Sequence, residues 1–546
     1  MSTSEVQGLN WSAERLIPGF QSVTHLDIYT VKGVSSETLI TLMTVVGLVN
    51  RPQPKIYLVL GDDEAFWLAE VFGNIPQKHI PTTNENILDV LLDAYLSNIQ
   101  GLVIYDSNLK DSINIATMIA AQKDGIAVSQ VQALALQNKY SLSILDDLSK
   151  YGWKSRLQAY HWALKNVRGG CSSRLVAGLD LKNMHLRSFL VATRTFIYNL
   201  DSRNYLPEPR SISTHGLLSE RELMRQILHS FPPGAVHLGW FVDESSGVKL
   251  TSQAALPVLA TDLFSNLEVW TAVPIPTPQV ARSASLPPVV SPLPRADEPT
   301  SATNTVYVSF TISDGDNLQY SQHRMKNIWC DKVRGTLPIG WTISPSIVHV
   351  APLLAEYYRE SATPNDEFIA GPSGAGYIFP SHWPPEQIDA FLQTTGKQMQ
   401  TMNMTTLQIL DTDYWQSSGI PLISIIRQTG MIFSNINRQQ QYIRTLRPFG
   451  LRGILSGAGL KKVMWKAETE VVLYQNLGLA DSVRGTVTMI KKVANSRSER
   501  PLFLNIYILA WKMSPTDLKA VVEQLGSGYE VVLPKTLLAM LAQAST

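Results

Sequence analysis

In the first half of the chain, short apolar runs alternate with longer amphipathic stretches. Residues 55–60 (KIYLVL) and 101–105 (GLVIY) have the length and composition of buried strands, and 86–96 between them has helical spacing. Alternating strands and helices are typical of a parallel sheet with crossover helices. We therefore predict two smaller α/β domains, 1–150 and 151–273. In the second of these we expect one helix and two strands, at 153–167, 188–198 and 235–242.

The second half has a more regular pattern, because most of its apolar runs are separated by enough chain for one helix. Residues 304–546 are close in length to a (β/α) barrel, which usually has about 250 residues. We predict a C-terminal (β/α) barrel-like domain, and a doubly wound open sheet is the alternative. The predicted strands are 305–313, 336–343, 367–370, 406–410, 430–433, 451–455, 502–509 and 529–533.

A proline-rich segment separates the two halves. Residues 274–299 contain eight prolines, with Ser, Thr and Ala between them. Proline removes a backbone donor and restricts the residue before it, so a regular helix is not expected there. We predict a linker over 274–303.

Composition and charge exclude several classes of protein. The chain has 46 Lys and Arg against 45 Asp and Glu, and no basic block, so nucleic acid is not an expected partner. The longest apolar run, 39–49, is far shorter than the ~20 residues that span a bilayer, so no membrane span is predicted. The N-terminus lacks the features of a signal peptide, which predicts a cytoplasmic protein as encoded; a secreted protein whose signal is missing from this chain is the alternative. The oligomeric state is left open.

Several predicted strands end in polar loops, which a parallel α/β domain brings together at one face. The strand at 305–313 is followed by Asp314 and Asp316, and side chains two apart in an extended segment share a face. Asp411 and Asp413 repeat this spacing after another strand. Such carboxylate pairs can act as nucleophile and acid/base or bind a cation, and the alternative is a solvated turn.

A glycine-rich loop, 371–380 (GPSGAGYIFP), follows a third predicted strand. Glycine permits positive φ, so the backbone N–H groups around Ser373, Gly374 and Gly376 could hold an oxyanion, a hydroxyl or a phosphate. The alternative is a turn fastened by Tyr377. The loop has neither the P-loop ending nor the dinucleotide fingerprint, so no cofactor is predicted.

Tryptophans also gather near the predicted strand ends, and indole faces suit the C–H faces of sugars as well as cations. For each of them the alternative is packing in the core or at its rim. The histidines are isolated and lack zinc-binding spacing, so no metal ligands are predicted. The four tryptophans are Trp341, Trp383, Trp415 and Trp511.

The segment 374–380 (GAGYIFP) resembles the signature of the GxGYxYP family, described as putative glycoside hydrolases. Phe379 stands where that signature has its second tyrosine, so one hydroxyl is absent here. The resemblance implies a multidomain protein with a glycosidase-barrel-like C-terminal domain and a role in polysaccharide use. Family members are often exported, and this chain departs from them by lacking a signal. Further similar stretches are 47–57 (GLVNRPQPKIY), 239–244 (GWFVDE) with Asn266-Leu267, 308–317 (VSFTISDGDN), 337–345 (LPIGWTISP) and 364–373 (PNDEFIAGPS).

These observations lead to the hypothesis of a glycoside hydrolase that acts on a poly- or oligosaccharide. Such enzymes place two carboxyl groups beside the scissile bond. We expect Asp314 or Asp316 to be one of them and Asp413 to be the other, with Glu244 from the GWFVDE segment as a further candidate.

In this hypothesis Trp383 and Trp415 stack on the sugar, and Asn317 bonds to its hydroxyls. A carbohydrate-binding protein without catalysis would need the aromatics and the glycine loop but no carboxyl pair. A metal-dependent carbohydrate esterase or deacetylase would use Asp314 and Asp316 as ligands. Both alternatives stay open at this point.

Overall fold

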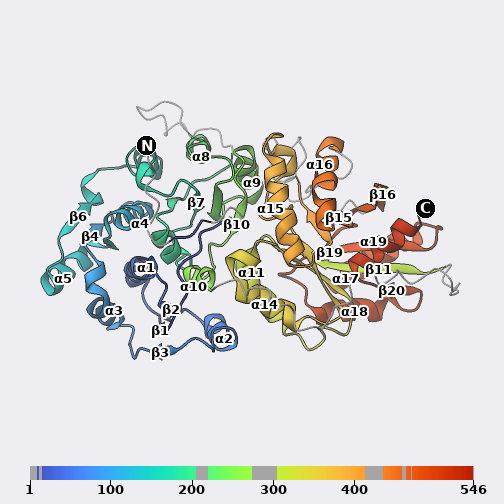
Figure 1. Cartoon of the computed structure of the whole chain (residues 1–546), viewed down its shortest axis with the longest axis horizontal. Helices are drawn as coiled ribbons and strands as arrows, with labels where there is room; N and C mark the ends of the chain where they lie inside the picture. Colours follow the sequence, from blue (N-terminus) through green and yellow to red (C-terminus); the bar gives the residue numbers. More distant parts are fainter. Residues whose placement is uncertain are drawn as a thin grey trace. The chain divides into compact units, whose positions relative to one another are not determined.

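The computed structural model describes residues 9–11, 15–203, 219–273, 304–411, 435–457, 463–468 and 470–544. The chain divides into two compact units, coloured blue to green and yellow to red in Figure 1. Unit 1 contains residues 1–274 and 349–354, and unit 2 contains 275–348 and 355–546. The predicted linker and the predicted strand at 430–433 lie outside the described residues. The boundary near residue 150 stays a prediction.

Unit 1 contains three sheets of parallel strands, in the orders β2-β1-β3, β5-β4-β6 and β10-β9-β7-β8. In each sheet the first strand of the sequence lies inside the sheet, so the chain winds outward from it in both directions, as in doubly wound folds. The strands are β1 (Leu26–Thr30), β2 (Ile56–Val59), β3 (Gln77–His79), β4 (Leu102–Ile104), β5 (Ile126–Val128), β6 (Ile144–Asp147), β7 (Leu175–Gly178), β8 (Phe196–Tyr198), β9 (Val236–Gly239) and β10 (Val258–Ala260).

The helices of unit 1 connect these strands, as the crossover connections of parallel strands require. They are α1 (Ser36–Asn50), α2 (Asp62–Glu70), α3 (Ile87–Tyr95), α4 (Ser112–Lys123), α5 (Gln130–Tyr140), α6 (Arg156–Asn166), α7 (Arg187–Ala192), α8 (Glu220–His229), α9 (Glu244–Gln253) and α10 (Leu267–Ala272).

The segment 188–198, predicted as one strand, instead forms helix α7 followed by the short strand β8. All six residues of α7 are buried. A helix that is buried on every side needs no polar face, so its sequence lacks a clear helical period and resembles a buried strand. Helix α1 accommodates α7 at Gly47, where a Cβ would lie 2.5 Å from the Ser188 carbonyl oxygen and from Val191 Cβ.

Unit 2 is built around one curled sheet in the order β16-β17-β15-β14-β13-β12-β11-β19-β18, with β20 beside β11. All pairs are parallel except β16 with β17. The strands are β11 (Val306–Ile312), β12 (Ile339–Ile343), β13 (Asp366–Ala370), β14 (Thr406–Ile409), β15 (Gly453–Ser456), β16 (Met464–Glu468), β17 (Val471–Gln475), β18 (Leu479–Ala480), β19 (Leu502–Ile508) and β20 (Tyr529–Val531).

The segment 471–480 links the two sides of the curled sheet. Its first half, β17, pairs with β15. In its second half, Leu477 N donates to Asn505 O of β19 (2.9 Å), and β18 pairs with β19. Strands therefore surround a common interior, and the predicted C-terminal (β/α) barrel-like fold is confirmed. The helices of 304–546 are α11 (Leu318–Gln322), α12 (Arg324–Trp329), α13 (Ile347–Val350), α14 (Pro352–Ser361), α15 (Ile388–Thr401), α16 (Ile436–Leu446), α17 (Val483–Asn495), α18 (Pro515–Leu525) and α19 (Pro534–Gln543). Residues 349–354, in α13 and α14, belong to unit 1.

The interior of this sheet contains a buried chain of amide and hydroxyl groups, which we call the amide network. The Ser309 and Thr311 hydroxyls donate to Asn505 Oδ1, at 2.6 and 3.0 Å. Asn505 Nδ2 donates to Asn476 Oδ1 (2.6 Å), and Asn476 Nδ2 donates to Gln408 Oε1 (2.9 Å). All five side chains are fully buried. Because buried polar groups are stable only when bonded, this network fixes the register of β11, β14 and β19 and ties them to the segment 471–480 at Asn476.

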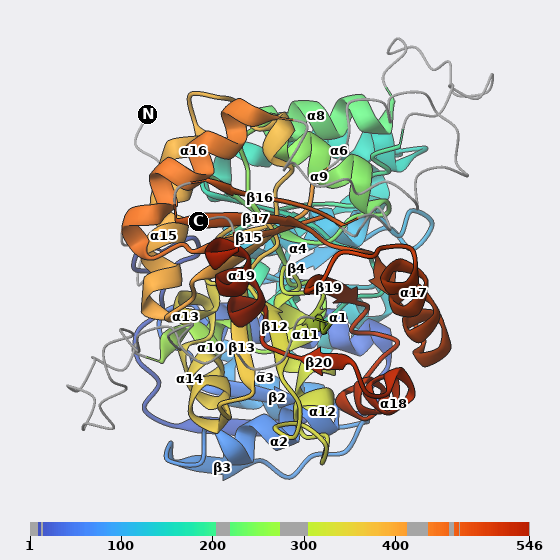
Figure 2. The same ribbon diagram turned by 90° about the vertical axis from the view of Figure 1, so that its right-hand side faces the viewer.

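Helix α19 fills the interior toward the amino-terminal ends of the strands. Its Leu537, Leu538 and Leu541 pack with apolar side chains of β13, β15, β17 and β19. Figure 2 shows α19 among these strands, with α15 and α16 on one side of unit 2 and α17 and α18 on the other. Gly453 makes room for the helix, because a Cβ there would lie 2.3 Å from Leu538 Cδ1.

Glu367 on β13 is buried where α19 begins. Its carboxylate accepts from the Lys535 backbone N–H (2.7 Å) and from the Thr406 hydroxyl (2.8 Å). Acidic groups at a helix N-terminus are favourable. Burial nevertheless raises the pKa of Glu367 to about 7, although both hydrogen bonds lower it.

Glu367→Gln is therefore expected to flatten the pH dependence of stability. A carboxyl pKa that is higher in the folded than in the unfolded chain favours folding below about pH 4.5, and this contribution is lost as pH rises through about 7. Denaturant unfolding measures the free energy of unfolding at pH 5 and at pH 8.5. Between these two pH values it should fall by about 3 kcal/mol more for wild type than for the variant. Glu360→Gln, on an exposed position of α14, is the control. Equal pH slopes for Glu367→Gln and wild type would contradict the prediction.

Candidate active site

The loops that follow β11, β12, β13 and β14 are tied together at the carboxyl ends of the strands. Gly315 N donates to the Thr342 hydroxyl (3.0 Å), and the Ser344 hydroxyl donates to Ala375 O (3.3 Å). The Ser373 hydroxyl donates to Leu410 O (2.9 Å). The loops that carry Asp314, the glycine-rich segment and Asp411 therefore lie at the same end of the sheet.

Asp314 lies in the loop after β11 with a φ of 74°, in the left-handed region. Its Oδ2 accepts from the Ser313 hydroxyl (2.5 Å), and its Oδ1 accepts from the Trp511 indole N–H (2.8 Å). The residue keeps a partly exposed surface, although protein surrounds most of the carboxyl. Burial raises the pKa of Asp314 by more than these two hydrogen bonds lower it. The carboxyl thus retains its proton at higher pH than an ordinary aspartate.

Trp511 and Tyr320 lie beside this carboxyl. Trp511 follows β19 and is 48% exposed, and its ring meets that of Tyr320 edge-on at 5.9 Å. The Tyr320 hydroxyl is buried and has no hydrogen-bond partner among the described residues. Burial, and then the charge of Asp314, raise the pKa of Tyr320, so its phenol is neutral. The 510–511 segment is held in place because Arg324 Nε donates to Ala510 O (2.9 Å).

Gly315 explains how the Asp314 loop can lie so close to its neighbours. A Cβ at Gly315 would lie 2.5 Å from backbone atoms of Thr342, Ile343 and Gly371, none of which can yield as a side chain could. Only glycine fits this position without moving the ends of β12 and β13.

Asn317 and Asp316 complete the same loop. The Asn317 side chain accepts from Tyr320 N (2.9 Å) and so caps helix α11. Asp316 is partly exposed. The sugar-binding role of Asn317 and the catalytic role of Asp316 stay predictions, and the cap shows that Asn317 also has a structural task.

The glycine-rich loop is buried throughout, Gly376 and Tyr377 included. Ser373 N donates to Gln408 O (2.8 Å), and Ala375 N donates to the Thr395 hydroxyl (3.0 Å). A Cβ at Gly374 would lie 2.7 Å from that same hydroxyl. Two of the amides that we expected to hold a ligand therefore bond to protein, and the loop at these positions fastens β13 to its neighbours.

Asp411 follows β14 and is almost completely buried. Its carboxylate accepts from both the backbone N–H and the hydroxyl of Ser381. It thereby positions the turn at Pro380–His382, which follows the glycine-rich loop. Asp413 and Trp415, two residues on which the hypothesis depends, lie outside the described residues.

The other tryptophans do not gather around Asp314. Trp341 is fully buried, donates to Asp366 Oδ1 (2.9 Å) and packs edge-on against Trp329. Trp383 is buried against Phe391, with ring centroids 5.2 Å apart. Both placements favour packing, which was the alternative considered for each. Of the three predicted tryptophans that the structure describes, Trp511 is the one whose ring is available to a ligand at this end of the sheet.

Glu244 belongs to unit 1, where it is the first residue of α9. The preceding Asp243 caps this helix by accepting from Ser246 N (2.9 Å). Acidic residues in the first turn stabilise a helix. The catalytic role of Glu244 stays a prediction.

Sequence reasoning missed Tyr320 and the amide network. The network had a signal: polar residues at alternate positions of β11, and single amides within the apolar strands β14 and β19. Such residues point to one face, and in a curled sheet that face is the interior.

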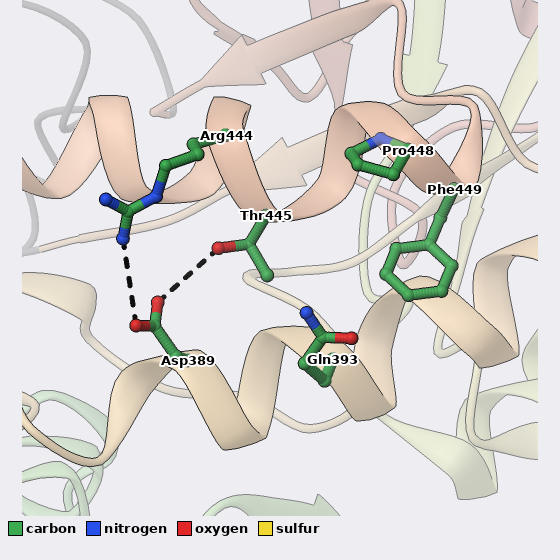
Figure 3. A pocket seen from close by; sticks show the side chains of 6 residues that line it. All are labelled: Asp389, Gln393, Arg444, Thr445, Pro448 and Phe449. Carbon is green, nitrogen blue, oxygen red and sulfur yellow. Dashed lines mark hydrogen bonds and ion pairs between the residues drawn. The ribbon is translucent and has the colours of Figure 1, made fainter.

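A separate groove lies between α15 and the end of α16 (Figure 3). Asp389 of α15 faces Arg444 (3.7 Å) and the Thr445 hydroxyl (3.4 Å) across it. The groove is lined by Asp389, Gln393, Arg444, Thr445, Pro448 and Phe449, and none of these is a predicted site residue. Its exposed ion pair contributes little to stability.

Two features are absent from the described residues. No group of three or more His, Cys, Asp or Glu side chains in this part of the chain could hold a metal ion. No helix within the described ranges has the length and apolar character needed to cross a bilayer.

Three family models match successive parts of the chain. They are the GxGYxYP_N second domain at 99–171, the GxGYxYP third domain at 173–272, and the GxGYxYP putative glycoside hydrolase C-terminal domain at 304–542. The chain belongs to the GxGYxYP family. The resemblance found in the GAGYIFP segment is thus confirmed. In this GxGYxYP protein the C-terminal match, 304–542, contains Asp314 and Trp511.

A solved structure shares this fold. It is a protein from Bacteroides thetaiotaomicron VPI-5482 described as a putative hydrolase, with 21% identity and a TM-score of 0.75, over 98% of this GxGYxYP chain and 99% of that one. A protein from Mycobacterium smegmatis described as a putative polysaccharide deacetylase is 9% identical, over 45% of this chain and 93% of that one, and its TM-score of 0.29 is too low to compare folds. No curated protein matches the chain.

Proposed function

We propose that unit 2 hydrolyses a glycosidic bond in a poly- or oligosaccharide, with Asp314 as the proton donor. The observation that carries this proposal is the Asp314 carboxyl itself, held at the carboxyl ends of the strands by Ser313 and Trp511. In α/β barrels the active site lies at this end. Membership of a family described as putative glycoside hydrolases supports the reaction class.

A general acid must still hold its proton at the pH of the reaction. Burial raises the pKa of Asp314, as this role requires. Asp314 would give its proton to the leaving glycosidic oxygen, and it would take a proton back from water in a later step or from solvent. The rate should therefore fall as pH rises through the raised pKa of Asp314.

Trp511 supplies a surface for the sugar beside the acid. Its indole N–H is bonded to Asp314, so the orientation of the ring is fixed, and about half of the residue is exposed. A fixed aromatic face can stack on the apolar face of a pyranose ring and hold the adjoining bond near the carboxyl.

The reaction also needs a second carboxylate, to attack the anomeric carbon or to activate water. Asp316 in the same loop and Asp413 after β14 are the candidates we retain in unit 2. Asp411 is the weaker candidate, because its carboxylate already accepts from Ser381.

A glycan screen tests this function. We expect wild type to release reducing ends from at least one polysaccharide in a panel of plant, algal, fungal and animal glycans. Trp511→Ala should reduce kcat/KM there by about tenfold or more, since it removes both the stacking face and a hydrogen bond to the acid. If Trp511→Ala kept the activity of wild type and bound the glycan as tightly, the proposed role of Trp511 would be contradicted. Binding without hydrolysis would identify a non-catalytic carbohydrate-binding protein, and activity abolished by chelators would favour the metal-dependent esterase or deacetylase.

A further inference from the structure

Three aromatic side chains meet at the surface of unit 1, around the start of α6. We call Tyr151, Trp153 and Trp162 the aromatic cluster. Ring centroids are 4.9 Å apart for Tyr151 and Trp153, 4.9 Å for Tyr151 and Trp162, and 5.2 Å for the two tryptophans. Gly152 between the first two has a φ of 67° with open space around it, so the chain turns here to bring both rings to one place.

The cluster differs from the aromatic core of the same unit. Trp67 and Trp270 are fully buried and pack edge-on, 5.9 Å apart. In contrast, Tyr151 is 39% exposed, and both indoles of the cluster are partly exposed. Exposed apolar patches on a protein surface often mark sites of binding.

Polar groups lie beside these rings. No described residue accepts a hydrogen bond from either indole N–H of the cluster. The Tyr151 hydroxyl donates to Asp146 Oδ1 (3.2 Å), whose carboxylate also pairs with Lys123 (3.0 Å). Hydrogen-bond donors and acceptors, among them one acidic and one basic side chain, therefore lie at the edge of the aromatic surface.

We propose that the aromatic cluster is a second glycan-binding site, which stacks on the pyranose rings of a polysaccharide outside the catalytic unit. The substrate class rests on the proposed function. A pyranose presents an apolar C–H face and a rim of hydroxyls, and the cluster presents the complement: ring faces with donors and acceptors beside them.

The test is affinity electrophoresis of the full chain in native gels that contain one soluble polysaccharide each: mixed-linkage β-glucan, xylan, galactomannan, pectin or pullulan. We expect at least one of them to retard wild type. Trp153→Ala should weaken that binding by about tenfold, and Trp153→Phe, which keeps a ring, should weaken it less. Leu134→Ala is the matched control, because Leu134 is also an exposed apolar residue of unit 1. Thermal melting checks that each variant is folded.

The variants separate this proposal from the proposed function. Asp314→Asn should lose hydrolysis but keep the retardation, because the aromatic cluster is intact. Hydrolysis by wild type together with unchanged retardation of Trp153→Ala would overturn the second site and leave the active site standing. Retardation that depends on Trp153 without any hydrolysis would support the second site and count against the active site. If no polysaccharide retards wild type, the second site is wrong.

Discussion

Asp314→Asn is expected to abolish hydrolysis while leaving unit 2 at least as stable as wild type. General acid catalysis contributes about 10²–10⁴-fold to a rate, and asparagine cannot donate a proton in this way. Asparagine keeps the shape of the side chain and tolerates a left-handed backbone, which position 314 adopts with its φ of 74°. Its carbonyl oxygen can still accept from Trp511, and its NH₂ group can donate to Ser313.

The stability part of this prediction follows from the sign of the pKa shift. Because the pKa of Asp314 is raised in the folded chain, ionising the carboxyl at neutral pH destabilises the fold, and asparagine removes that cost. Steady-state rates on the glycan identified by the screen, together with thermal melting at pH 7, measure both effects. Asp389→Asn, in the exposed groove of unit 2, is the matched control. Full activity of Asp314→Asn would show that another residue supplies the proton, and Asp316→Asn would then be examined.

Asn505→Asp should have the largest effect on stability, because it introduces a carboxylate into the amide network. The side chain of Asn505 donates to Asn476 Oδ1 (2.6 Å) and accepts from Ser309 and Thr311. An oxygen in place of the NH₂ group would face another oxygen in a fully buried site. Burial can raise a carboxyl pKa by about 3 units or more. We therefore expect Asn505→Asp to lower the free energy of unfolding by about 4 kcal/mol at pH 8.

This loss should shrink as pH falls. The carboxyl introduced by Asn505→Asp would have a folded pKa above its unfolded value, so its penalty is present at high pH and disappears below about pH 4, where the proton can donate to Asn476. Denaturant unfolding at pH 5 and pH 8 measures the difference between variant and wild type. Asn403→Asp, on an exposed position of unit 2, is the control and should change stability little. A pH-independent loss would mean that packing, and not charge burial, sets the cost.

Most strands that are continuous apolar runs bounded by turn residues were predictable, although β17 (VVLYQ) is such a run and was missed. β11, β12 and β19 were placed within a few residues because they have this pattern. β16 was missed because its sequence, MWKAE, alternates polar and apolar residues over only five positions. The link through 471–480 could not be predicted, because it depends on hydrogen bonds between segments that only the curled sheet brings together.

The candidate site was predictable at the level of strand ends and less so at the level of single side chains. Trp341 is close in sequence to a strand end, and so we expected it near the ligand. In β12, however, Gly340 faces the interior, where a Cβ would lie 2.7 Å from Pro534 Cγ of α19. Alternation along the strand then turns Trp341 outward, toward Trp329. The pairing of Trp511 with Asp314 joins the first and last long strands of the sheet, a contact that no local pattern predicts.

The pairing of β11 with β19 has a consequence for biosynthesis. These strands are hydrogen-bonded along their whole length, from Val306 with Leu502 to Ile312 with Ile508, and are 196 residues apart. At about 5–20 residues per second, β11 leaves the ribosome on the order of 10–40 s before its partner exists. During that interval one side of an apolar strand is open to other nascent chains. We therefore expect the yield of soluble protein to depend on the supply of chaperones and on the expression temperature, which sets the rate of translation. These two conditions should matter more than the final stability of the fold.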